Sequence, residues 1–234
     1  MTRLFALLLV IYLAWTLATL HREETPRARP SLAVLLLQTP LFFLACWIAW
    51  QREAFSRDLV FPVSIFCGVV LGHLIFCVSL LATHRVWRDV LEHLADLRAL
   101  GAFLKENPDL MLRFFGVALT EEIIYRAAAQ PLLAEWTGRP LLSIVVVAVV
   151  FSLVHRHFFR NEVAQSAEFV VFALLLGGLY YASGSLILVV LVHTVRNLES
   201  VFLEYLAKVE ELGGEAQAQE VIEQTYSWRA SEHS

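Results

Sequence analysis

Long apolar segments alternate with short polar ones along most of this chain. A membrane-spanning helix needs about 20 mostly apolar residues, and several segments approach or exceed that length. The candidate spans are 4–20, 31–50, 59–82, 109–129, 140–157, 166–183 and 185–206. The pattern predicts an all-α fold, a polytopic transmembrane helix bundle of about seven spans. We expect the first span to be a retained anchor, because no clear A-x-A cleavage site follows it.

Segment 85–106 has a different pattern. Its apolar residues recur at helical spacing, and charged residues occupy much of the rest. This arrangement predicts one amphipathic helix lying in the membrane interface. Asn107-Pro108 would end that helix, and Asp109 could then cap the following span.

The composition agrees with a membrane protein and divides the chain in two. Hydrophobic residues make up 58% of the 234 residues, whereas soluble domains have about 45–50%. We predict a transmembrane domain over 1–207, with its motif core at 109–200, and an acidic polar C-terminal tail over 208–234. No basic stripe indicates nucleic-acid binding. The three cysteines form no CxxC pair, so no disulfide framework or thiolate metal site is indicated.

The charges of the loops predict the orientation in the membrane. With seven spans, four of the loop cations fall on one side, namely Arg3, Arg52, Arg57 and Arg139. Eleven fall on the other side: Arg22, Arg27, Arg29, Arg85, Arg88, Arg98, Lys105, Arg156, Arg160, Lys208 and Arg229. Since cytoplasmic loops are enriched in Lys and Arg, we expect an integral protein of the bacterial inner membrane with a cytosolic C-terminus.

Three short motifs place polar groups inside the apolar helices. They are Glu121-Glu122-x-x-x-Arg126, Phe151-x-x-x-His155 and His193-x-x-x-Asn197. Residues four apart share one face of a helix. Ionisable groups are costly at membrane depth and usually mark a functional site. The three motifs together therefore predict a polar catalytic chamber within the bilayer.

Each motif also has a purely structural alternative. Glu122 and Arg126 could be only a buried ion pair that fixes helix packing, although this leaves Glu121 unexplained. His155 by itself is typical of an interfacial histidine that reaches toward water. The polar groups of the third motif could simply hydrogen-bond between helices. The case for chemistry therefore depends on the three motifs as a set.

Two mechanisms fit this set of side chains. A carboxylate beside a histidine can deprotonate a water molecule, while a histidine and an amide can donate hydrogen bonds to an oxyanion. Alternatively, Glu121, His155 and His193 could hold a Zn²⁺ ion with water as the fourth ligand, although the H-E-x-x-H signature is absent. Spacing leaves both open; we predict no cofactor, with zinc as the alternative.

The three motifs, in this order on successive apolar helices, resemble the CAAX-protease and bacteriocin-processing (CPBP, Abi) family of glutamic-type intramembrane proteases. The resemblance covers about residues 109–200 and implies an all-helical membrane endopeptidase. The catalytic residues it implies are Glu121, Glu122, Arg126, His155, His193 and Asn197. The first glutamate and the second-motif histidine would activate water, the third-motif pair would stabilise the oxyanion, and the arginine would orient the second glutamate.

The implied partners are a membrane-associated protein or peptide substrate and the lipid bilayer. The resemblance does not select a prenylated or an unprenylated substrate. Two other functions fit the same buried polar groups, a non-catalytic membrane scaffold or immunity protein and a proton-coupled transporter. A transporter predicts two repeated halves with broken helices, a pattern that the sequence does not have.

Overall fold

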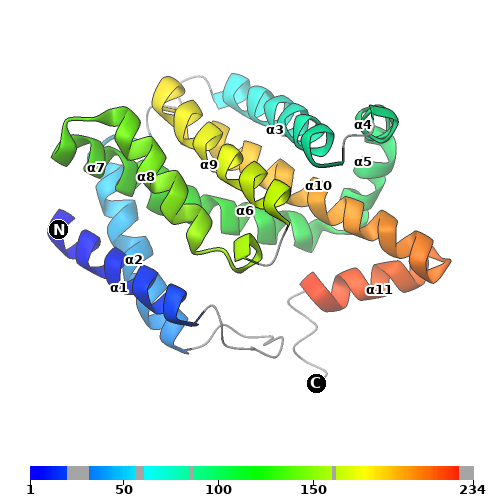
Figure 1. Cartoon of the computed structure of the whole chain (residues 1–234), viewed down its shortest axis with the longest axis horizontal. Coiled ribbons are helices and arrows are strands. Elements are labelled where there is room, and N and C mark those ends of the chain that lie inside the picture. Colours follow the sequence, from blue (N-terminus) through cyan, green and yellow to red (C-terminus); the bar gives the residue numbers. More distant parts are fainter. Residues whose placement is uncertain (20–31, 56–60, 85–86, 160–161, 227–234) are drawn as a thin grey trace.

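The computed structural model describes residues 1–19, 32–55, 61–84, 87–159 and 162–226. All elements in this described part are helical, which confirms the predicted all-α class (Figure 1). They are α1 (Thr2–Thr19), α2 (Leu32–Gln51), α3 (Phe61–His84), α4 (Trp87–Ala95), α5 (Leu97–Glu106), α6 (Pro108–Glu122), η1 (Ile123–Ala129), α7 (Gln130–Thr137), α8 (Pro140–Leu153), η2 (Arg156–Phe159), α9 (Val163–Ser183), α10 (Leu186–Leu212) and α11 (Glu215–Tyr226).

Four of the described helices are long and apolar enough to cross a membrane. They are Thr2–Thr19, Pro62–Thr83, Val163–Ser183 and Leu186–Leu212. Leu36–Gln51 and Pro140–Leu153 are apolar but shorter. The predicted count of seven spans is not confirmed. The predicted span 109–129 comprises α6 and η1 in the structure. Its charged side chains Glu122 and Arg126 are fully buried.

The amphipathic segment predicted over 85–106 is helical in its described part, but it is not one continuous helix. The described residues of this segment form two helices, α4 and α5, which are separated at Asp96. The Asp96 carboxylate accepts a hydrogen bond from the backbone N–H of Ala99 (3.2 Å) and so caps α5. An aspartate that bonds to the backbone in this way favours the start of a new helix over continuation of the old one.

The start of α6 also differs from the expectation, because the residue at the cap position is Asn107 and Asp109 lies in the first turn. The Asn107 amide donates to the Phe103 carbonyl (2.8 Å) and its oxygen accepts from the Gln219 side chain (2.7 Å). Gln219 belongs to α11, within the predicted acidic tail. Residues 208–226 of that tail are largely helical, and Ile222 is fully buried against α5, α6 and α10.

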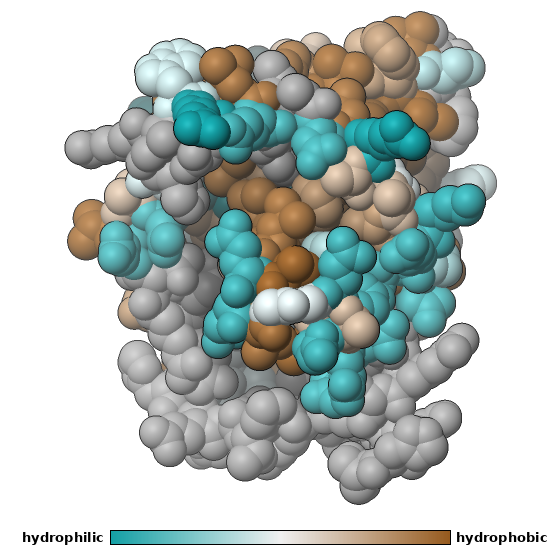
Figure 2. All heavy atoms as spheres, turned by 90° about the vertical axis from the view of Figure 1, so that its right-hand side faces the viewer, coloured by the Kyte–Doolittle hydropathy of each residue, from teal (hydrophilic) through white to brown (hydrophobic). Residues whose placement is uncertain are grey.

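Helix α10 runs from the middle of the bundle to one end, where α11 turns back beside it (Figure 1). Gly213 permits this reversal with a φ of +73°, a conformation that favours glycine. The end formed by α10 and α11 carries many hydrophilic side chains (Figure 2). In contrast, α2, α3 and α8 expose large apolar side chains such as Phe43, Phe66 and Leu141. Such side chains suit a surface that faces lipid.

Helix α3 approaches α10 closely at two glycines one turn apart. A Cβ atom built on Gly68 would lie 2.8 Å from the Cβ of Leu191, and one built on Gly72 would lie 2.8 Å from the Cβ of Val195. Small residues at this spacing let the backbones of membrane helices come together. The contact holds α3 against the part of α10 that carries the third motif.

Gly72→Ala should therefore destabilise the protein by about 1–3 kcal/mol, the usual cost of overpacking a tight contact. Thermal unfolding in detergent measures the effect. Gly178→Ala in α9 is the matched control, because no atom lies within 4 Å of the position that its new methyl group would take, and it should be neutral or stabilising. Equal melting temperatures for Gly72→Ala and the wild type would show that the close approach does not contribute.

Candidate active site

The two adjacent glutamates stand at the end of α6 and have different surroundings. Glu122 is completely buried, whereas the side chain of Glu121 keeps 21% of its surface exposed. The helix continues beyond them as the π-helix η1, all of whose residues are buried. π-helical turns are rare and often occur at functional sites.

Glu122 belongs to a buried network of three ionisable groups. Its Oε1 accepts a hydrogen bond from His193 Nδ1 (2.8 Å), and its Oε2 lies 3.3 Å from Arg126 Nε. The predicted pairing of Glu122 with Arg126 is therefore present. Arg126 is fully buried, donates from Nη2 to the Ala173 carbonyl (3.3 Å) and places its guanidinium carbon 4.5 Å from the centre of the Phe151 ring. The network thus joins η1 to α8, α9 and α10.

Glu121 faces the other two motifs. Its Oε1 lies 3.5 Å from His155 Nε2, and its Oε2 lies 3.8 Å from His193 Nε2. Three motifs that are far apart in the sequence therefore meet at one carboxylate. Glu121 Oε2 is buried and has no hydrogen-bond partner within the described part of the chain. An acceptor of this kind can receive a proton or a hydrogen bond from a bound molecule.

The partners of the two histidines fix their tautomers. His155 Nδ1 lies 2.6 Å from the carbonyl oxygen of Phe151, and because a carbonyl only accepts, Nδ1 must carry the proton. His193 Nδ1 likewise donates to a carboxylate oxygen of Glu122. In the neutral imidazoles, both Nε2 atoms then present a lone pair toward Glu121. Such second-sphere hydrogen bonds orient a histidine for chemistry at its other nitrogen.

An aromatic wall surrounds these imidazoles. The Phe151 ring is fully buried and lies 4.4 Å from the His155 ring and 6.0 Å from the His193 ring, between centres. Phe169 contacts His155 (5.1 Å) and Phe172 contacts His193 (5.8 Å). Apolar rings exclude water and strengthen electrostatic interactions inside the site. Phe151 belongs to the second motif, whereas the two rings of α9 were not anticipated from the sequence.

Residues 104–198 match the family model for type II CAAX prenyl endopeptidase Rce1-like proteins. These residues therefore form an Rce1-like domain. The family of that domain is the CAAX-protease and bacteriocin-processing family that the motifs resemble, and the matched range contains all six predicted site residues. No curated protein and no solved structure matches the chain. The Rce1-like domain and the long apolar helices together identify an integral membrane protein.

Asn197 is the one predicted site residue that stands apart in the Rce1-like domain. It lies one turn beyond His193 on α10 and is partly exposed. Among the described residues, no hydrogen bond or ion pair joins it to the other five. The tertiary structure therefore brings together Glu121, Glu122, Arg126, His155 and His193, and Asn197 has no hydrogen bond or ion pair with them among the described residues.

Two further ion pairs, both partly buried, escaped the sequence analysis. Glu199 of α10 accepts a hydrogen bond from His73 Nδ1 of α3 (2.8 Å), and Glu168 of α9 pairs with Arg196 of α10 (2.7 Å). Both pairs join ionisable residues of predicted spans. An ionisable residue in an apolar segment could have indicated a functional or paired group, but the sequence does not show which residues pair.

The donor types of Glu121, His155 and His193 suit zinc, but the geometry does not provide a ligand set. Among the residues that the structure describes, no group of three or more His, Cys, Asp or Glu residues is placed to hold a metal ion.

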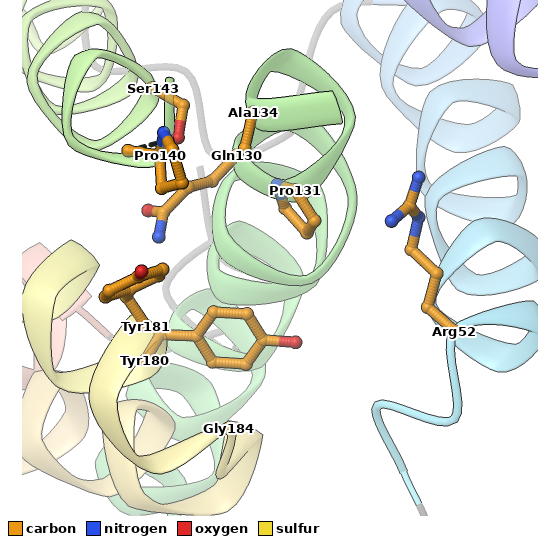
Figure 3. Close-up of a pocket in the computed structure, with 9 residues that line it drawn as sticks. All are labelled: Arg52, Gln130, Pro131, Ala134, Pro140, Ser143, Tyr180, Tyr181 and Gly184. Atoms are coloured by element: carbon orange, nitrogen blue, oxygen red, sulfur yellow. Dashed lines mark hydrogen bonds between the residues drawn. The ribbon is translucent and has the colours of Figure 1, made fainter. Parts of the chain in front are cut away.

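A separate cavity of about 340 Å³ lies at the opposite ends of α8 and α9 from the site. In Figure 3 the Gln130 amide points between Ser143 and Tyr181, with Arg52 on the far side. Gln130 Nε2 donates to the Gly177 carbonyl (3.0 Å), while its buried Oε1 has no partner in the described residues. This cavity contains none of the motif residues.

Arg126→Ala should lower the free energy of unfolding by about 3–5 kcal/mol, because Glu122 would lose the guanidinium that balances its buried charge. Thermal or denaturant unfolding in detergent measures the loss. The double variant Glu122→Gln/Arg126→Gln leaves no buried charge and should be destabilised less than Arg126→Ala. Equal stability of Arg126→Ala and the wild type would contradict the pairing.

Proposed function

We propose that this protein is an intramembrane endopeptidase that hydrolyses a peptide bond in a membrane-associated protein substrate. The observation that carries the proposal is the convergence of two oriented imidazoles on Glu121, at 3.5 and 3.8 Å. None of the six predicted site residues is a serine or a cysteine. The nucleophile is therefore a water molecule.

The two histidines differ in their partners, and this difference assigns their roles. His193 donates to an anion, Glu122, whereas His155 donates to a neutral carbonyl. To donate to an oxyanion, His193 must carry a proton on Nε2 while Nδ1 stays bonded to Glu122. His155 keeps the Nε2 lone pair that a base requires.

Hydrolysis then follows in two proton-balanced steps. Glu121, with His155, removes a proton from water, and the hydroxide oxygen bonds to the carbonyl carbon of the substrate. The electron pair of the C=O bond moves to oxygen, where His193 Nε2 donates a hydrogen bond to the oxyanion. The oxyanion then re-forms the C=O bond as the C–N bond breaks, and the retained proton passes to the leaving amide nitrogen. Asn197, one turn beyond His193, is proposed as a second donor that approaches when substrate binds.

The orientation of the protein is part of the proposal. The eleven-to-four distribution of loop cations favours a cytosolic C-terminus in a bacterial inner membrane. The hydrophilic end formed by α10 and α11 (Figure 2) suits an aqueous environment of this kind. Substrates would then reach the site from the cytosolic half of the bilayer.

Glu121→Gln should abolish cleavage while the protein still inserts and accumulates. Losing a general base costs about 10²–10⁴-fold in rate, and the amide cannot take the proton. Comparing membrane proteomes of wild-type and Glu121→Gln strains should reveal a protein that accumulates uncleaved in the variant. Glu135→Gln, at an exposed glutamate of α7, is the matched control. Cleavage of that protein at the wild-type rate by purified Glu121→Gln would refute the role of Glu121.

Chelators should leave the activity of the purified protein unchanged, because the proposed steps use only side chains and water. Incubation with 1,10-phenanthroline or EDTA, followed by the same cleavage assay and by metal analysis, tests this expectation. Stoichiometric zinc that is lost together with activity, and is absent from His193→Ala, would establish the metal mechanism instead.

A further inference from the structure

A second ion pair lies directly behind the aromatic wall of the site. Arg196 of α10 donates from Nη2 to Glu168 Oε2 of α9 at 2.7 Å. Their side chains retain only 14% and 13% of their surface exposed. Even partial burial of such a pair carries a desolvation cost. The pair therefore calls for a role beyond holding α9 against α10.

The Arg196 guanidinium contacts two aromatic rings at once. Its central carbon lies 4.5 Å from the centre of the Phe172 ring and 5.5 Å from the centre of the Phe169 ring. A planar cation within about 6 Å of a ring is attracted to it. Glu168 limits the movement of the guanidinium, because their hydrogen bond fixes its position relative to α9.

The other contacts of these two rings lead into the site. Phe169 contacts the imidazole of His155 at 5.1 Å between centres, and Phe172 contacts that of His193 at 5.8 Å. Both contacts are edge-to-face, with interplanar angles of 64° and 73°. Each ring thus lies between one guanidinium and one of the two histidines that face Glu121.

We propose that Arg196 and Glu168 are positioning residues of the active site. They hold Phe169 and Phe172 in place, and these rings fix the two imidazoles at the angles from which both Nε2 atoms face Glu121. Neither residue belongs to the six predicted from the motifs. The catalytic consequence rests on the proposed function, whereas the placement of the imidazoles does not.

A competing role for the same pair is contact with the substrate. Arg196 and Glu168 also line a cavity of about 560 Å³ between α3, α9 and α10, together with residues such as Ser79, Ser200 and Leu203. A residue that binds substrate equally in the ground and transition states affects KM, whereas a positioning residue affects kcat. The kinetic parameters therefore separate the two roles.

The test uses the double variant Glu168→Gln/Arg196→Gln, because either single change would leave one buried charge unpaired. We expect kcat to fall by about 10- to 100-fold, as for other small misplacements of reacting groups, with KM unchanged. Arg196→Lys keeps the charge but loses the planar group over the rings, so its kcat should also fall. The assay uses the protein that accumulates uncleaved in the Glu121→Gln strain.

The matched control is Arg52→Gln/Glu135→Gln, which removes another Arg–Glu pair between helices. That variant should keep the wild-type kcat. A fall in kcat of the same size in the control, or a rise in KM at unchanged kcat in Glu168→Gln/Arg196→Gln, would overturn the positioning role.

A measurement without substrate keeps this inference separate from the proposed function. Aromatic rings shift the NMR signals of nearby protons, so the ring protons of His155 and His193 report on Phe169 and Phe172. Both histidine signals should move in Glu168→Gln/Arg196→Gln and stay in place in the control pair variant. His155→Gln and His193→Gln assign the signals. Unmoved signals would refute the positioning role, whereas moved signals in a protein that cleaves nothing would refute the protease function alone.

Discussion

The buried charge of Arg126 is the constraint on which the arrangement of the site depends. A fully buried guanidinium in an apolar bundle must be compensated by an anion, by carbonyl oxygens or by aromatic faces. Here Glu122, the Ala173 carbonyl and the Phe151 ring supply all three. Because these partners come from α6, α9 and α8, satisfying one cation fixes the relative positions of three helices.

The same network makes the two glutamates unequal. Glu122 is completely buried and faces Arg126 with one oxygen and His193 with the other. Glu121 lies at the adjacent position along the helix, about 100° around it, and its side chain keeps 21% of its surface exposed. Of the two carboxylates, Glu121 is therefore the more accessible to a bound molecule.

Helix α9 carries none of the six predicted site residues, yet it orders the helices that do. The carbonyl oxygen of Ala173 accepts a hydrogen bond from Arg126, and that of Gly177 accepts one from Gln130. The two donors and the two acceptors are each four residues apart in the chain. A Cβ atom at Gly177 would lie 2.9 Å from Gln130 Oε1, so a larger residue at this position would displace the Gln130 side chain. The aromatic residues of α9 meanwhile complete the wall behind the histidines.

The sequence by itself determined the helical class, the three motifs and the residues that share a helix face, because hydrophobic periodicity and i, i+4 spacing are local properties. It did not determine the number of spans, since hydropathy alone does not separate a helix buried among other helices from one that faces lipid. It also missed the break at Asp96, where a side chain captures a backbone N–H. Only the tertiary structure decided which histidine pairs with which glutamate, that Asn197 stands apart, and that Arg196 backs the aromatic wall. These outcomes depend on contacts between segments that are distant in the sequence. The free energy of those contacts depends on which ion-pair or hydrogen-bond partner lies next to each buried charge.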